Sequence, residues 1–231
     1  MSAWLTTSQV AEIFAEEMAG ANGDVREAFH DDSHLFVRGV LRPTIEVAPH
    51  DKLQGGVALC ATDADIFVHP YVFRIVCTNG AIMATATQTV HISRDNWEDR
   101  SDYESELETT IRTAVRSCCM PEAFVVAADQ MRSARHGTAD MAIMIATFMG
   151  SHRVAQWAHM MGEILRRYDR GSDRSSYGLM NAITSVARDT RDPQTKWRLE
   201  ELGGSVPAML RQPAGKPRPG RSVVKSLVEV G

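Results

Sequence analysis

The sequence has few of the features that point directly to catalysis or to a metal. It contains four cysteines, none of them in a C-x-x-C pair, and no histidine spacing completes a zinc site. The G-x-x-x-x-G-K-[ST] and G-x-G-x-x-G patterns that anchor nucleoside triphosphates and dinucleotides are also missing. We therefore predict no metal and no cofactor, and we assign no catalytic residue.

Long hydrophobic runs are missing as well. The longest apolar stretch, residues 141–149, is about half the length that a bilayer span needs. The first 18 residues have no basic region and contain Glu12, Glu16 and Glu17, which is unlike a signal peptide. We expect a cytoplasmic protein that does not enter a membrane, with its cysteines as buried thiols in a reducing compartment.

Charge is distributed unevenly along a chain of otherwise ordinary composition. The 231 residues are 44% hydrophobic and 23% charged, which is typical of a globular protein. Residues 1–149 carry 11 basic and 21 acidic side chains, whereas residues 150–231 carry 14 basic and 8 acidic ones. This division predicts a surface for anionic partners, or complementary surfaces through which copies stack as a homo-oligomer, or pairing within the chain.

Hydrophobic periodicity predicts an α+β fold, because strands and helices are segregated along the chain. An N-terminal helix capped by Thr7 or Ser8 has Val10, Ile13, Phe14 and Met18 at helical spacing. A central antiparallel β-meander follows, and a helical C-terminal half is expected to pack on the sheet. The predicted strands are residues 35–41, 44–47, 57–61, 66–78 and 81–92.

The helical half has recognisable start signals. Ser101 to Glu104 form a capping box before a stripe of Leu107, Ile111, Ala114 and Val115, and Pro121 suits the first position of a further helix. Asp192-Pro193 begins a short helix that Gly203-Gly204 should end. We predict one domain over residues 1–210, β-rich over 34–92 and helical over 101–204. Residues 211–231 are expected to form a basic, flexible tail.

Asn79-Gly80 lies between two apolar runs and predicts a two-residue hairpin turn. In that register Thr78 faces Ala81, and alternation places Tyr71, Phe73, Ile82 and their neighbours on a core face. The opposite face would hold Val72, Arg74, Thr85 and Thr87. It is either a groove floor that holds phosphates or a solvated strand surface. The same register separates Cys77 from His91, which excludes a thiol–imidazole dyad.

Three segments resemble the uncharacterised phage/plasmid-like protein family, a domain of unknown function found on prophages, plasmids and other mobile elements. The segments are residues 71–80 (YVFRIVCTNG), residues 177–187 (YGLMNAITSVA), and Asp51 with Gly55-Gly56. They span most of the chain. The resemblance implies a mobile-element setting and supplies no catalytic residue.

Basic side chains gather in the C-terminal half. Arg166, Arg167 and Arg170 form one cluster, and Lys196 beside Trp197 belongs to another. Cations next to an aromatic ring suit single-stranded nucleic acid, although a large aromatic residue is also a common core anchor.

We therefore predict a nucleic-acid-binding accessory protein of a phage or plasmid, acting in replication, recombination or strand annealing, with single-stranded DNA as a candidate ligand. The expected contacts are Arg74, Arg166, Arg167, Arg170, Lys196 and Trp197. The alternative is a non-enzymatic protein that binds a host protein and counters a defence system, with the acidic N-terminal part as its surface.

Overall fold

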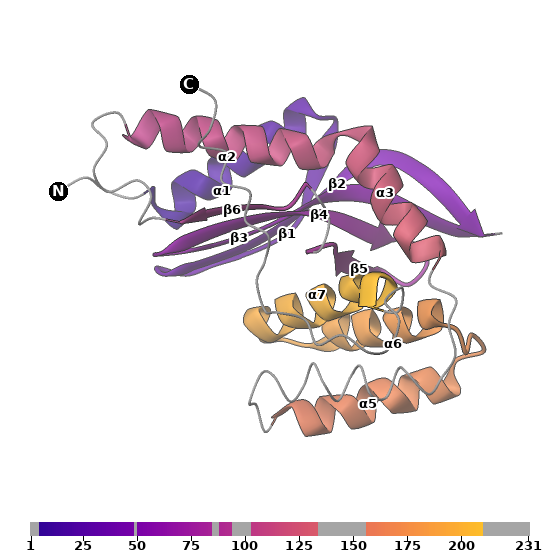
Figure 1. The fold of residues 1–231 in the computed structure, drawn as a ribbon. Helices are drawn as coiled ribbons and strands as arrows, with labels where there is room; N and C mark the ends of the chain where they lie inside the picture. The colour runs from indigo at the N-terminus through magenta and orange to yellow at the C-terminus, as the bar shows by residue number, and fades with distance from the viewer. Residues whose placement is uncertain (1–4, 49, 85–87, 94–102, 134–155, 210–231) are drawn as a thin grey trace.

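The structure is a computed structural model that describes residues 5–48, 50–84, 88–93, 103–133 and 156–209. The fold is α+β, as predicted (Figure 1). Its elements, in chain order, are α1 (Thr7–Gly20), β1 (Gly23–His30), β2 (His34–Ala48), β3 (Asp51–Thr62), β4 (Asp65–Arg74), β5 (Asn79–Ile82), β6 (Val90–Ser93), α2 (Tyr103–Cys119), α3 (Pro121–Arg132), α5 (Gln156–Arg170), α6 (Ser176–Asp189) and α7 (Pro193–Met209).

The strands form one antiparallel sheet in the order β1-β2-β3-β4-β5, and β6 also pairs with β4. β5 and β6 share the same edge of β4. β5 pairs with residues 71–74 and β6 pairs with residues 65–68. His69 and Pro70 therefore lie in a break between the two short strands.

Helices cover both faces of the sheet (Figure 1). α1 and α2 pack on one face, where Phe14, Leu59 and Ile111 belong to one buried cluster. α7 lies across the other face and packs against α6, and α5 forms an outer layer on α6. Trp197 of α7 joins the buried cluster of that second face. The helical half thus packs on the sheet, as the sequence predicts.

The predicted apolar stripes of α1 and α2 are confirmed. Val10, Ile13, Phe14 and Met18 are buried, as are Leu107, Ile111, Ala114 and Val115. The N-cap of α1 is Thr6, one residue before the predicted cap, and its side chain accepts a hydrogen bond from the backbone of Gln9. Pro121 is the first residue of α3.

The predicted two-residue turn at Asn79-Gly80 is wrong. Arg74 pairs with Asn79 and Tyr71 pairs with Ile82, so residues 75–78 make the turn and Asn79-Gly80 belong to β5. The positive backbone angle lies at Thr78, with φ of 51°. Gly80 is required for a different reason. A Cβ atom there would lie 1.9 Å from the Tyr71 hydroxyl oxygen.

The predicted polar face is also wrong. The observed register differs from the predicted one by an even number of residues, so alternation still places Tyr71 and Ile82 on one face. However, the opposite face is not an open floor, because Val72 is 1% exposed and belongs to a core cluster with Met83. Thr85 and Thr87 lie outside the described residues.

Strand β1 was not predicted, because its side chains give no hydrophobic signal. Gly23 is its one buried residue, and the remaining seven are exposed. β1 is an edge strand, and a bulge between Val25 and Glu27 interrupts its pairing with β2. β2 joins the two predicted strands into one, with a register shift between Val40 and Thr44 around Pro43.

Helix α7 runs past Gly203-Gly204 to Met209, so the predicted end of the helix is wrong. The two glycines allow close approach. A Cβ on Gly204 would lie 2.1 Å from the carbonyl oxygen of Ile82, and one on Gly203 would lie 2.6 Å from Thr184 Cγ2. The predicted tail at residues 211–231, the apolar stretch 141–149 and the capping residue Ser101 lie outside the described residues.

Candidate functional site

The predicted contact Arg74 is engaged within the protein. Its Nε and Nη2 donate to the two carboxylate oxygens of Asp51 at 2.7 and 2.9 Å. The Tyr177 hydroxyl donates to the same carboxylate at 2.7 Å. Burial and this hydrogen bond to Asp51 raise the pKa of Tyr177 above its usual value. The contacts join β3, β4 and α6, and they bring together the three segments that carry the family resemblance.

The predicted α5 cluster lies on the outer helical layer. Arg166 is exposed and pairs with Glu163. Arg167 donates to Glu163 and to Asp189, both at 2.7 Å. Arg170 is exposed at the end of α5. Two of these three predicted contacts therefore have acidic partners on their own or the neighbouring helix.

The side chains of Lys196 and Trp197 extend from α7 to the sheet. Lys196 Nζ contacts the Glu27 carboxylate at 2.5 and 2.6 Å, which is a pair between the acidic and basic parts of the chain. Beside it, Arg38 Nε donates to Glu200 at 2.5 Å, and both side chains are almost fully buried. Arg38 also lies over the Trp197 ring, 5.4 Å from its centroid. This ion-pair group fixes α7 on the sheet.

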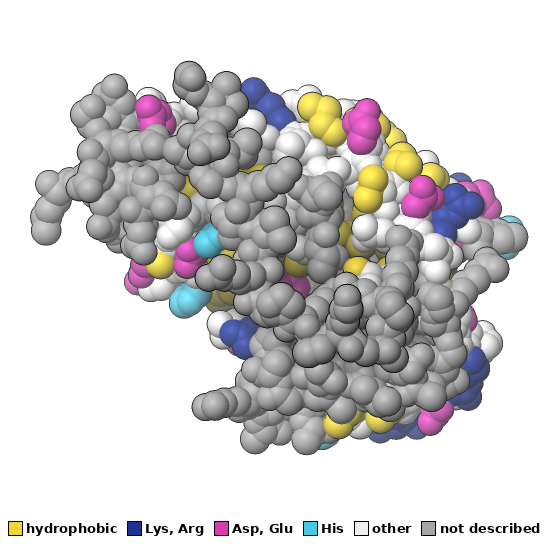
Figure 2. Space-filling view, viewed as in Figure 1, with side chains coloured by type: hydrophobic (Ala, Val, Ile, Leu, Met, Phe, Trp, Pro, Cys, Tyr) yellow, Lys and Arg dark blue, Asp and Glu magenta, His cyan; other side chains and the backbone are white. Residues whose placement is uncertain are grey.

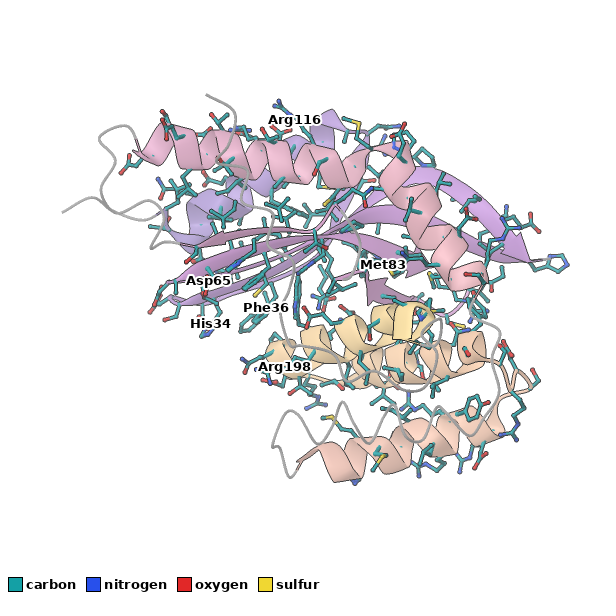
Figure 3. All side chains as sticks on the ribbon, viewed as in Figure 1. His34, Phe36, Asp65, Met83, Arg116 and Arg198 are labelled. Carbon is teal, nitrogen blue, oxygen red and sulfur yellow. The ribbon has the colours of Figure 1, made fainter. Side chains whose placement is uncertain are left out.

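Trp197 also lines a pocket between α7 and the sheet. The cavity has a volume of about 410 Å³ and lies beside the break in the β4 edge. Figure 3 shows His34, Phe36 and Asp65 on the sheet side, with Arg198 on α7 below them. In the space-filling view, histidine side chains of the sheet layer lie above a basic side chain of the helical layer (Figure 2). The lining residues are His34, Phe36, Cys60, Thr62, Phe67, His69, Ala84, Thr89, His91, Gln194, Trp197, Arg198 and Glu201.

Flat rings dominate the pocket wall. The Phe67 ring stacks on His91, with centroids 4.4 Å apart and planes at 2°, and it lies 6.2 Å from the nearly parallel ring of His69. Trp197 lies 5.8 Å from both Phe36 and His69, with tilted planes. Such a wall suits another flat ring by stacking.

Two titratable groups meet on the inner wall of the pocket. Burial lowers the pKa of His69 to about 4, so the imidazole is neutral at pH 7. Burial raises the pKa of Glu201 to about 7, against the opposing effects of a hydrogen bond from Trp197 and the charge of Arg198. His69 Nε2 lies 3.9 Å from Glu201 Oε1. Because burial keeps the imidazole neutral, we regard this contact as polar rather than ionic.

The remaining polar groups are held by neighbours. His91 Nε2 lies 2.7 Å from Asp65 Oδ1. Burial raises the pKa of the Cys60 thiol to about 12, so this pocket cysteine is protonated and a poor nucleophile at neutral pH. Within the described residues, no three His, Cys, Asp or Glu side chains are grouped so that they could hold a metal ion.

Sequence reasoning found Trp197 but missed the rest of the pocket. Two signals could have found it. His34 and Phe36, like Phe67 and His69, alternate along strands and so share a face. On α7, the pocket residues Gln194, Trp197, Arg198 and Glu201 follow the i, i+3, i+4, i+7 spacing of one helix face.

The comparisons with protein-family models, with curated proteins and with solved structures find no match to this chain. The resemblance to the phage/plasmid-like family therefore stays a prediction. Among the described helices, none combines the length and the apolar character needed to cross a membrane.

Proposed function

We propose that this chain binds single-stranded nucleic acid, with one base in the pocket and a neighbouring phosphate at Arg198. It would act as an accessory protein of a phage or plasmid in replication, recombination or strand annealing. The observation that carries the proposal is the ring-lined pocket with Arg198 among its lining residues. The family resemblance supports the mobile-element setting.

The size and wall of the pocket support a base as the occupant. Ligand pockets commonly measure about 300–1,000 Å³ and combine apolar walls with a few polar groups. The cavity of about 410 Å³ falls in this range. Stacking of a base on an aromatic side chain contributes about 1–3 kcal/mol and tolerates any base. Phe67, which is half-buried, lines the pocket together with the almost fully buried Phe36 and Trp197.

Arg198 is the most suitable phosphate contact near the pocket. Lys196 and Arg74 are paired with Glu27 and Asp51, so a phosphate would have to displace a carboxylate. Arg198 makes no ion pair with another described residue, and its side chain is half-buried at the pocket. Arg191, two residues before the start of α7, is exposed and adds positive charge nearby.

Salt-dependent binding of a labelled single strand tests the proposal. We expect affinity to fall steeply between about 50 and 200 mM salt, because phosphate contacts release counterions. Arg198→Gln should weaken binding and lower the log–log slope by about one. Arg166→Gln, on the outer helix α5, tests the cluster predicted from the sequence. An absence of binding at about 50 mM salt would overturn the proposal.

A protein partner is the second candidate, and exposed apolar side chains at the N-cap of α3 and within α3 favour it. Met120, Val125 and Val126 are 51%, 47% and 39% exposed. Such a surface suits a host protein or a second copy of the chain in a homo-oligomer. Light scattering on the wild type and on a Val125→Ser, Val126→Ser variant tests self-association. If the wild type and the variant both have the mass of a monomer, the homo-oligomer is excluded.

A further inference from the structure

The tautomer of His69 can be assigned from the hydrogen bonds of its neighbour Thr89. The Thr89 hydroxyl has one proton, which it donates to the backbone oxygen of Ala84 at 3.3 Å or of Met83 at 3.4 Å. Its lone pair is then left to accept from His69 Nδ1, which lies 3.3 Å away. We assign the imidazole proton to Nδ1 on this basis, because the opposite tautomer would require the Thr89 hydroxyl to donate to Nδ1 instead of to a backbone oxygen. Because the imidazole is neutral, Nε2 is a hydrogen-bond acceptor.

The Nε2 lone pair faces a second acceptor. Glu201 Oε1 lies 3.9 Å away, beyond the range of a direct hydrogen bond. Above its pKa of about 7, the Glu201 carboxyl is ionised, so it offers acceptor oxygens and has no proton to give. Two acceptors this far apart can share one donor nitrogen placed about 2.9 Å from each. The donor needs two protons. It would approach from the side of Glu201, because 31% of the Glu201 side chain is exposed and only 5% of the His69 side chain.

The pocket wall restricts what can bring that donor. The rings of Phe36, Phe67 and Trp197 favour a flat group, and an exocyclic amino group on a heteroaromatic ring supplies two N–H donors in its plane. We propose that Glu201 and His69 together accept hydrogen bonds from the exocyclic amino group of a nucleobase and so recognise it. This inference rests on the proposed function. Bases that place a carbonyl oxygen there would face two acceptors and leave them unsatisfied.

Oligonucleotides of deoxycytidine and deoxyuridine provide a matched test, because the two bases differ at the amino position and at the neighbouring ring nitrogen. We would measure binding of 12-residue strands of each at about 50 mM salt and pH 8, where Glu201 is ionised. We expect the deoxycytidine strand to bind about tenfold more tightly, as loss of one hydrogen bond to a charged group predicts. Adenosine and inosine monophosphates test the same contact in purines.

Glu201→Gln should reduce the tenfold preference to near unity, because the amide can turn an N–H₂ donor toward a carbonyl. Thr89→Val, which removes the acceptor that sets the His69 proton, should also reduce it. Glu104→Gln on α2 is the matched control and should keep the preference. Circular dichroism verifies that each variant is folded.

The outcomes separate the two proposals. Equal binding of the two strands, or a preference that survives in Glu201→Gln, would show that the amino group is not read, while the proposed function stands. If neither strand binds at this salt concentration, the proposed function itself fails, and this inference fails with it.

Discussion

Asn79 Nδ2 donates a hydrogen bond to Thr184 Oγ1 at 2.6 Å, and this contact joins β5 to α6 inside the protein. Asn79 is 3% exposed and Thr184 is 4% exposed. The Thr184 hydroxyl in turn donates to the Met180 backbone oxygen at 2.9 Å. The contact connects two of the segments that suggested the family resemblance, and it gives both a structural role.

Asn79→Ala should therefore destabilise the protein. It leaves the Thr184 hydroxyl without its donor in a buried site, which costs about 1–3 kcal/mol in free energy of unfolding. Urea denaturation measures this loss, and Glu12→Ala on the exposed side of α1 serves as the control. A variant as stable as the wild type would show that the contact contributes nothing to stability.

Two helical glycines should respond to alanine in opposite directions. Gly204→Ala places a Cβ 2.1 Å from the Ile82 backbone oxygen, which cannot move without shifting β5. We expect a loss of about 1–3 kcal/mol from this overpacking. Apart from the backbone of α5 itself, no atom of the described residues lies within 4 Å of a Cβ added to Gly162, so Gly162→Ala should stabilise by about 0.5–1 kcal/mol.

Thermal unfolding of the two glycine variants beside the wild type compares them directly. A gain of stability in both would mean that α7 does not approach β5 as closely as described.

Glu201 should make stability depend on pH. The pKa of Glu201 in the folded protein, about 7, lies above its usual value of 4.5, so the folded state holds the proton more tightly than the unfolded chain. The free energy of unfolding therefore falls as pH rises from about 4.5 to 7, and this loss is a penalty on the folded state. Glu201→Gln removes this penalty. Its stability relative to the wild type should rise over that window, by about 2 kcal/mol after allowance for solvent screening.

Urea denaturation of wild type and Glu201→Gln at pH 5, 6, 7 and 8 tests this dependence. A stability difference that stays constant across the four pH values would show that Glu201 does not titrate in this range.

The four cysteines should differ in reactivity. Burial raises the pKa of Cys60 and Cys118 to about 12 and that of Cys119 to about 11, so these thiols stay protonated at pH 8. Cys77 is half-buried in the turn after β4, where Arg74 Nη1 contacts its sulfur at 3.2 Å. Because thiolates react faster than thiols, the raised pKa values of the other three cysteines should slow their alkylation, and Cys77 should be alkylated first in the native protein.

Mass spectrometry after brief iodoacetamide treatment identifies the labelled cysteine, and urea-unfolded protein provides the fully reactive control. Earlier labelling of Cys118 in the native state would contradict the buried position of this residue on α2.

The fold class could be predicted from the sequence because apolar periodicity is a local property. Val10 and Phe14 revealed α1 in this way, and Leu107 and Ile111 revealed α2. The Asn79-Gly80 turn and the end of α7 at Gly203-Gly204 were predicted wrongly for a shared reason. A glycine that permits close packing looks the same in a sequence as one that permits a turn. The neighbour that requires it, such as Tyr71 or Ile82, is known only from the tertiary contacts.

The candidate site was less accessible to sequence reasoning. Trp197 was selected because of its cationic neighbours, yet Lys196 points to Glu27 and the ring points into the sheet. The pocket depends on where α7 crosses β2, β3 and β4, and on the way in which β5 and β6 share one edge. Neither relationship leaves a local pattern, so His69 and Glu201, 132 residues apart in the chain, could not be paired in advance.

The shared edge of β4 has a consequence for how the protein opens. β6 is four residues long and pairs with residues 65–68 of β4, while β5 holds residues 71–74 independently. Release of β6 alone would detach His91 from Phe67 and open one wall of the pocket, while β1 to β5 keep their pairing. Local unfolding of short elements of this kind requires less free energy than global unfolding. Backbone amides of β6 should therefore exchange with solvent before those of β3, and a bound base should slow that exchange.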